Sequence, residues 1–288
     1  MALGKVRIIL VEPAGPLNVG SVARVMKNMG LQTLVLVNPQ CDPLGIEARQ
    51  MAVHGVDILE AAQQVATLPA ALTGCQRAIA TTARARTLST PLEPPRAALP
   101  WLLEESVTSA LIFGPEDRGL SNVELNYAQR FVCIPSSPEY PTLNLAQSVA
   151  VCCYELYQSA QQHSSSVGDE QSHPPSSSGT ADGSQMPTSV KIQNLLPTPY
   201  SSLHSVETAP IDMLEGYYEH LEAVLLKIGY LYPHTAQARM EKFRHFLNRA
   251  MPTTEEVAML RGILRQIEWA LQFQPKSVSG DKSEPNES

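Results

Sequence analysis

The chain has 288 residues, of which 43% are hydrophobic and 17% charged, and its formal net charge is −7 at pH 7. This length allows one large domain with its own core and a smaller second unit, and the composition is typical of a globular protein. The apolar runs are too short to span a membrane, and the N-terminus has no secretory signal pattern. The net negative charge argues against a generally basic nucleic-acid-binding protein but is compatible with a local basic patch.

The cysteines and histidines give no sign of a disulfide framework or a metal site. The cysteines are odd in number, include no Cys-x-x-Cys pair and lie mostly in apolar stretches: Cys41, Cys75, Cys133, Cys152 and Cys153. We therefore expect free thiols in a reducing, cytoplasmic environment. The seven histidines are scattered and form no cluster with ligand spacing, so no metal is expected. Because the apolar runs are short, no membrane partner is expected either.

Short apolar runs alternate with helical patterns over the first 160 residues. Continuous apolar runs of this length, separated by helices, are typical of a parallel sheet with helices on both faces. The sequence therefore predicts an α/β domain over residues 1–160. The five predicted strands are VRIILV (6–11), TLVLVN (33–38), RAIATT (77–82), SALIFG (109–114) and RFVCIP (130–135).

The segment EPAGPLNVGSVARVMKNMG (12–30) directly follows the first predicted strand. Asn18 is a candidate N-cap for a helix, and Gly30 fits the left-handed position that ends one. Arg24 lies about 200° from Val22 at 100° per residue, so it points away from the stripe that we expect to be buried. That stripe consists of Val22, Val25, Met26 and Met29.

Two later strands also end in polar turns that open helices. In LIFGPEDRGLSNVEL, Gly114 and Glu116 precede a capping box formed by Ser121 and Glu124. In IPSSPEYPTLNLAQSVAV, the turn at residues 142–144 precedes a helix with an apolar stripe. Because open α/β sheets bind ligands at the carboxyl ends of their strands, the three turns together indicate a binding site.

The sequence changes character after residue 160. Residues 161–209 are rich in Ser, Pro and Gly and are predicted to be a disordered linker, and residues 275–288 a disordered tail. Residues 210–274 are predicted to form a small helical domain, with a capping box at Thr253 and Glu256. Its aromatic side chains are expected in its core rather than on a base-stacking surface: Tyr217, Tyr218, Tyr230, Tyr232 and Phe243.

The three motifs, with ATTARAR (80–86) between the first and the second, resemble the TrmH-type SPOUT RNA 2′-O-ribose methyltransferases. The resemblance is closest to their tRNA methyltransferase branch, TrmJ, and covers nearly all of residues 6–156 in the family's order. It implies a trefoil knot in the C-terminal part of the α/β domain, although knots are otherwise almost absent from proteins. It also implies S-adenosyl-L-methionine as cofactor, and a homodimer whose catalytic groups are contributed across the interface.

The resemblance assigns roles to particular residues. Arg24 matches the arginine that contacts the reacting ribose and phosphate, so it is the expected catalytic residue, with Asn18 and Glu116 in support. Thr142 stands where the family usually has serine, which retains the hydroxyl. The residues expected around the cofactor are Thr81, Thr82, Ala83, Gly114, Ile134, Thr142, Leu143 and Asn144.

The same resemblance makes RNA the expected substrate. Arg84 and Arg86 lie two residues apart after the third predicted strand and are expected to contact phosphates. Residues 236–265 contain six basic residues against three acidic ones, so the helical domain is a candidate tRNA-binding unit. Within the TrmJ branch the target is a pyrimidine ribose at the start of the anticodon loop, conventionally position 32.

Two alternatives stay open at this point. The same chemistry on ribosomal RNA is one, because sister TrmH-type enzymes act there. An RNA-binding module that has lost methyl transfer is the other, although Arg24, Gly114 and Asn144 argue for an active enzyme. The sequence leaves undecided which tRNAs are modified, whether C or U is preferred, which group takes the proton, and which subunit the C-terminal helices serve.

Overall fold

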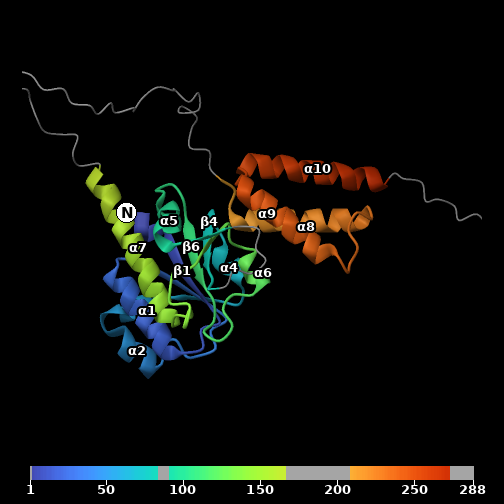
Figure 1. Ribbon diagram of the computed structural model, residues 1–288. Coiled ribbons are helices and arrows are strands. Elements are labelled where there is room, and N and C mark those ends of the chain that lie inside the picture. The colour runs from blue at the N-terminus through green and yellow to red at the C-terminus, as the bar shows by residue number, and fades with distance from the viewer. Residues whose placement is uncertain (1, 84–90, 167–207, 273–288) are drawn as a thin grey trace, which may run out of the picture.

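The computed structural model describes residues 2–83, 91–166 and 208–272 (Figure 1). Its centre is one parallel sheet with the strand order β3-β2-β1-β6-β4-β7-β5. The predicted α/β class with a parallel sheet is therefore confirmed. The strands are β1 (Val6–Val11), β2 (Thr33–Val37), β3 (Gln63–Val65), β4 (Arg77–Thr81), β5 (Leu92–Glu93), β6 (Ser109–Phe113) and β7 (Arg130–Val132).

Helices cover both faces of the sheet (Figure 1). The inner strand β1 shows why both faces need covering, because its side chains alternate between two cores. Ile8 and Leu10 point into one core, and Ile9 and Val11 point into the other. Each such fully buried aliphatic side chain contributes about 1.5–3 kcal/mol to folding. One face carries α1 (Pro16–Asn28), α2 (Ile46–Ala52), α3 (Val56–Glu60), α5 (Pro95–Ala98) and α7 (Leu145–Ser166); the other carries α4 (Leu68–Leu72) and α6 (Asn122–Leu125). Short 3₁₀ turns are η1 (Ala2–Lys5), η2 (Val53–Gly55) and η3 (Leu99–Leu103).

Helix α1 begins earlier than the sequence predicted. Its N-cap is Gly15 and its first residue is Pro16, so the expected N-cap role of Asn18 is wrong. A proline fits the first helical position because the N–H that it lacks would have no partner there. The predicted end is confirmed, since Gly30 has φ +71°. Arg24 is exposed on the side away from the core, as its position relative to Val22 predicted.

Helix α7 continues through Ser166, beyond the predicted boundary at residue 160. Gln161 and Gln162 are good helix formers, so the helix persists past its last apolar positions. The rest of the expected linker, from residue 167 to 207, and the expected tail lie outside the described residues. None of the helices that the structure describes is long and apolar enough to cross a membrane.

Three C-terminal helices pack around their own core, which includes Tyr218, Val224 and Val257. They are α8 (Ile211–Lys227), α9 (Ala236–Ala250) and α10 (Thr254–Gln272). The predicted capping box is confirmed, because the Glu256 carboxylate accepts from the Thr253 amide at 2.8 Å and the Glu256 amide donates to the Thr253 hydroxyl at 3.1 Å. The expectation of a core position is correct for Tyr217 and Tyr218, and Phe243 is partly buried.

Tyr230 and Tyr232 contradict that expectation, because they are 52% and 55% exposed. Helix α8 ends before them at Lys227, and Gly229, with a φ of +76°, turns the chain away from the helical path. The two tyrosines therefore lie in a loop, where the spacing of the α8 stripe no longer applies.

The C-terminal helices are attached to the α/β domain beside α4 and α6, away from α1, α2 and α7 (Figure 1). The Ile211 amide donates to the Cys75 carbonyl at 2.8 Å, and the Ile211 side chain joins the core on that face. The Gly74 amide donates to Asp212 at 2.9 Å. These bonds hold the start of α8 against the edge of α4.

Candidate functional site

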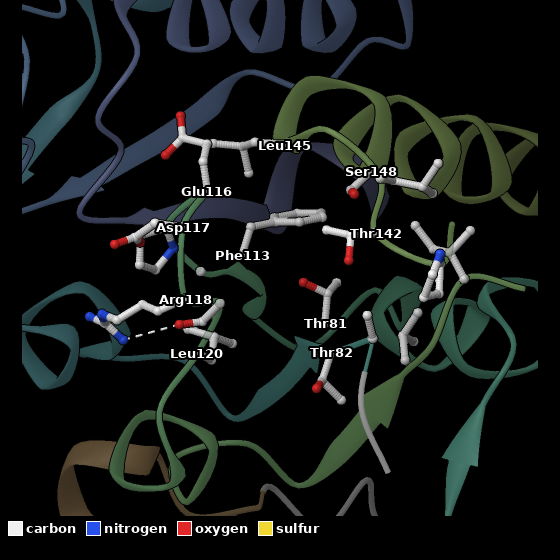
Figure 2. Close-up of a pocket in the computed structure, with 18 residues that line it drawn as sticks. Thr81, Thr82, Phe113, Glu116, Asp117, Arg118, Leu120, Thr142, Leu145 and Ser148 are labelled. Atoms are coloured by element: carbon white, nitrogen blue, oxygen red, sulfur yellow. Dashed lines mark hydrogen bonds between the residues drawn. The ribbon is translucent and has the colours of Figure 1, made fainter. Parts of the chain in front are cut away.

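A cavity opens at the carboxyl edge of the sheet, where β4, β6 and β7 end (Figure 2). Three segments of the chain line this cavity: the one after β4, the one after β6, and the loop between β7 and α7. The cofactor residues expected from the sequence line it, except Asn144. The lining residues are Thr81–Ala83, Phe113–Leu120, Val132, Ile134, Pro141–Leu143, Leu145 and Ser148.

The lining combines apolar walls with a few polar groups. Phe113, Leu120 and Ile134 provide apolar surface, while Thr81 at the end of β4 and Thr142 in the loop before α7 add hydroxyls (Figure 2). The Thr81 hydroxyl donates to the Ile112 carbonyl at 3.1 Å, which leaves its oxygen lone pairs facing other partners. A concave site that combines apolar walls with polar groups is suited to a nucleoside-like small molecule.

Gly114 is required by the shape of the loop that follows β6. A Cβ atom there would lie 2.4 Å from the Leu120 nitrogen and 2.5 Å from the Gly119 carbonyl carbon. The loop thus folds back on its own backbone, and Gly119 completes the turn with φ +66°. The nearest neighbour of Gly114 is therefore the loop itself.

A hydrogen-bond network joins the three motifs beside the cavity. The Glu116 carboxylate accepts from Asn18 Nδ2 at 2.8 Å and from the amides of Ala14 and Gly15 at 3.1 and 3.3 Å. Asn18 Oδ1 in turn accepts from Asn144 Nδ2 at 3.0 Å. The carboxylate is thus placed at the N-terminus of α1, where a negative charge is favourable.

Asn144 is the end of this network and the cap of α7. Its Oδ1 accepts from the Ala146 amide at 2.8 Å and from the Gln147 amide at 3.4 Å. It therefore ties the start of α7 to the start of α1, and it does not itself line the cavity. Asn18, Glu116 and Asn144 are far apart in sequence, and the fold brings them together.

Arg118 also lines the cavity, although it was not among the site residues expected from the sequence. It bonds to both oxygens of Glu124 at 2.9 and 3.0 Å and to Glu12 at 2.7 Å, and Nη1 also donates to the Gly119 carbonyl at 3.0 Å (Figure 2). Glu12 holds a left-handed backbone conformation, with φ +46°, which is uncommon for a residue with a side chain. Arg118 thus connects the loop after β1 to the loop that lines the cavity. The sequence feature that could have identified Arg118 is that it is a single cation near three acidic residues of the same motif.

These contacts shift the pKa values of the groups involved. Burial raises the pKa of Glu124, but hydrogen bonds from Arg118 and Ser121 outweigh it, so the pKa is lowered overall. The bonds to Glu124 and Glu12 raise the pKa of Arg118. Both groups of the pair are therefore charged near neutral pH.

Arg24 does not line the cavity of its own chain. It lies on the exposed side of α1, and its side chain forms no hydrogen bond or ion pair with another residue in the described part of the chain. Asn18, which is linked to the cavity loops, is six residues earlier and about 120° away around the helix. Arg84 and Arg86, the expected phosphate contacts, lie outside the described residues.

Two family models match the chain. The model of the SpoU rRNA Methylase family matches residues 5–154, and that of the tRNA methyltransferase TrmJ C-terminal domain matches residues 212–280. Together they take in the α/β domain, with its cavity, and the C-terminal helices.

Curated proteins and solved structures give the same relationship. The chain is 38% identical over 267 residues to the tRNA (cytidine/uridine/adenosine-2′-O-)-methyltransferase TrmJ of Pseudomonas aeruginosa, covering 92% of this chain and 94% of the relative. It is 38% identical to the tRNA (cytidine/uridine-2′-O-)-methyltransferase TrmJ of Salmonella typhimurium, covering 92% and 97%. The crystal structure of TrmJ from Z. mobilis ZM4 matches with a TM-score of 0.71 and 27% identity, covering 91% of this chain and 98% of that one.

Proposed function

Since the chain belongs to the SpoU methylase family and to its TrmJ branch, we propose that it methylates the ribose 2′-hydroxyl of a nucleotide in tRNA, with S-adenosylmethionine as the donor. The observation that carries this is the cavity at the ends of β4, β6 and β7, built from the motifs of the resemblance. A cytoplasmic location, where tRNA is found, is part of the proposal.

The apolar and polar groups that line the cavity fit the proposed cofactor. Apolar walls from Phe113, Leu120 and Ile134 suit an adenine ring, and the hydroxyls of Thr81 and Thr142 with the loop backbone suit its polar edges. When bound, the cofactor supplies an electrophilic methyl group. The protein's part is to hold the loop after β6 in shape, through Gly114 and the Arg118 contacts.

Arg24 is the proposed catalytic residue. A ribose hydroxyl is a weak nucleophile at neutral pH, so its orientation and the stabilisation of its developing negative charge matter most. A guanidinium carries a fixed positive charge and five donors, which suits it to hold a phosphate and the oxygen beside it. Asn18 and Glu116 are positioning residues, because their bonds fix the start of the helix that carries Arg24.

The proposal includes a homodimer, which the position of Arg24 outside its own cavity supports. The exposed side of α7 carries Val151 and Tyr154, and α1 exposes Leu17, so this side of the molecule offers apolar surface for a second copy. In the proposed dimer, Arg24 of one subunit reaches the cavity of the other. Closed two-fold pairing is the commonest way in which identical chains associate.

The proposed target is the pyrimidine at position 32 of the anticodon loop. To test it, the purified protein is incubated with S-adenosylmethionine and an unmodified tRNA transcript, and the digested RNA is analysed by mass spectrometry. A 2′-O-methylated pyrimidine in the anticodon-loop fragment is the expected product. Methylation of ribosomal RNA alone would keep the chemistry and reject the substrate, and binding of cofactor without any methylated RNA would favour an inactive RNA-binding module.

A further inference from the structure

The loop between α8 and α9 presents aromatic rings to solvent and fixes them in place. Arg239 lies with its guanidinium carbon 5.5 Å from the Tyr230 ring centre and donates to the Tyr230 carbonyl at 3.0 Å. Tyr232 stacks on His234 with the ring centres 6.0 Å apart and an interplanar angle of 25°. Both tyrosines are more than half exposed, so one face of each ring lies against a neighbour and the remaining surface is open.

A basic face of α9 continues from this loop. Arg239, Lys242, Phe246 and Arg249 fall within about 80° of one another around the helix, and Phe246 is 60% exposed. None of the three cations forms an ion pair with a carboxylate in the described ranges. Arg244 on the inner side of the same helix is different, because it is paired with Glu215 and lies over Tyr218.

We propose that these six residues form a surface that binds the unpaired nucleotides of the RNA substrate, and we call it the α9 surface: Tyr230, Tyr232, Arg239, Lys242, Phe246 and Arg249. The inference rests on the proposed function, since an anticodon loop offers unpaired bases. Exposed rings beside unpaired cations are the combination that single-stranded RNA needs, with rings for stacking and cations for phosphates. Charge complementarity selects RNA, because these unpaired cations are gathered on a chain of net charge −7.

Hydrogen bonds connect the helices that carry the α9 surface to the α/β domain. At the C-terminal end of α9, Asn248 Nδ2 donates to the Asn126 carbonyl at 3.4 Å, and Asn248 Oδ1 accepts from the Tyr218 hydroxyl at 3.0 Å. The start of α8 is held by Cys75 and Gly74. RNA bound along α9 is therefore held in a fixed relation to the catalytic domain, and the surface contributes to positioning the loop.

The test compares full-length variants that change rings or charges. Tyr230→Ala with Tyr232→Ala removes the loop rings, and Arg239→Gln with Lys242→Gln and Arg249→Gln removes the charges. Trp269→Ala and Arg265→Gln are matched controls, because both are exposed on α10. Binding is measured to an unmodified anticodon stem-loop and to a fully paired duplex, and methylation kinetics are measured with whole tRNA.

The ring variant is expected to bind the stem-loop about 10-fold or more weakly, since stacking contributes about 1–3 kcal/mol per base, while duplex binding is unchanged. The charge variant is expected to lower the slope of log K against log salt by roughly 0.7–0.9 for each phosphate that the protein no longer neutralises. In both, KM for tRNA rises while kcat at saturation and cofactor affinity stay at the wild-type level.

Several outcomes overturn the proposal. Wild-type stem-loop affinity in both variants of a correctly folded, tRNA-methylating protein rejects the α9 surface, as does an equal loss in the α10 controls. A change of oligomeric state in the ring variant would show that the surface binds a second copy instead. If the wild-type protein methylates no tRNA, the proposed function fails, yet loss of stem-loop binding in these variants alone would still support the surface.

Discussion

Arg24 is the residue on which the proposed chemistry depends. Arg24→Ala is expected to lower the rate of methyl transfer by about 10²–10³-fold, the usual cost of removing a donor that stabilises developing negative charge. Cofactor affinity should be unchanged, because the role proposed for Arg24 is to hold the ribose and phosphate of the RNA and not the cofactor. Single-turnover methylation and calorimetric binding of S-adenosylmethionine measure the two effects.

Lys27→Ala is the matched control for this variant. Lys27 is a cation on the same helix, but it pairs with Asp57 at 2.6 Å on the exposed surface. Its removal is expected to leave the methylation rate within about two-fold of wild type, because exposed pairs contribute little. A loss of cofactor binding in Arg24→Ala would contradict the role assigned to this arginine.

The pair of Arg118 and Glu124 predicts a dependence of stability on pH. The folded pKa of Glu124 is lowered, so the unfolded chain binds more protons between the folded pKa and the ordinary carboxyl value. The stabilisation that charged Glu124 gives to the folded state is therefore present at neutral pH and is lost as the pH falls through the folded pKa of Glu124. Glu124→Gln should be less stable than wild type at pH 7, and the difference should shrink in acid, as measured by urea unfolding. A constant difference would show that the charge of Glu124 is unimportant.

At the scale of helices, the caps determine where α10 begins. Thr253→Ala removes the hydroxyl that accepts from the Glu256 amide, and it is expected to lower the free energy of unfolding by about 1 kcal/mol. Thr254→Ala is the control, since Thr254 is the neighbouring, exposed threonine. Thermal unfolding compares the melting temperatures of the two variants, and that of Thr253→Ala should be the lower. Equal melting temperatures would contradict the capping role of Thr253.

The elements differ in how far sequence predicts them. Five strands were predictable because each contains buried apolar residues, which form continuous runs in β1 and β6. The strands β3 and β5 were missed because they are short edge strands without a buried residue, and Gln63 and Gln64 carry no apolar signal. Periodicity placed Tyr217 in the core but misplaced Tyr230, which lies past the end of the helix.

The candidate site also has features that the sequence predicts and contacts that it does not. Polar turns at the ends of strands pointed to Gly114 and to residues 142–144, because the carboxyl edge of a parallel sheet collects such turns, whereas Thr81 was assigned by the family resemblance. The bond from Asn18 to Glu116 joins residues 98 positions apart, so no local pattern predicts it. The contact of Arg118 with Glu12 also depends on a left-handed backbone at Glu12 that sequence does not reveal.

At the scale of the whole molecule, the proposed dimer predicts complementation between two inactive chains. Arg24→Ala keeps its cavity, and Gly114→Val keeps Arg24 but places a side chain where the loop has no room. Mixed in equal amounts and allowed to exchange subunits, they should recover about a quarter of wild-type activity, because half of the dimers then contain one complete site. No recovery, despite exchange shown by tagged subunits, would place Arg24 at the cavity of its own chain.

The proposed function requires that the methyl acceptor is the ribose 2′-oxygen at position 32 of tRNA. The most direct measurement uses two transcripts of one tRNA, identical except that position 32 carries a 2′-deoxyribose in the second. Transfer of labelled methyl from S-adenosylmethionine to the first, and loss of that transfer with the second, is the predicted result. Equal methylation of both transcripts would contradict the account, because the acceptor would then be a base or another position.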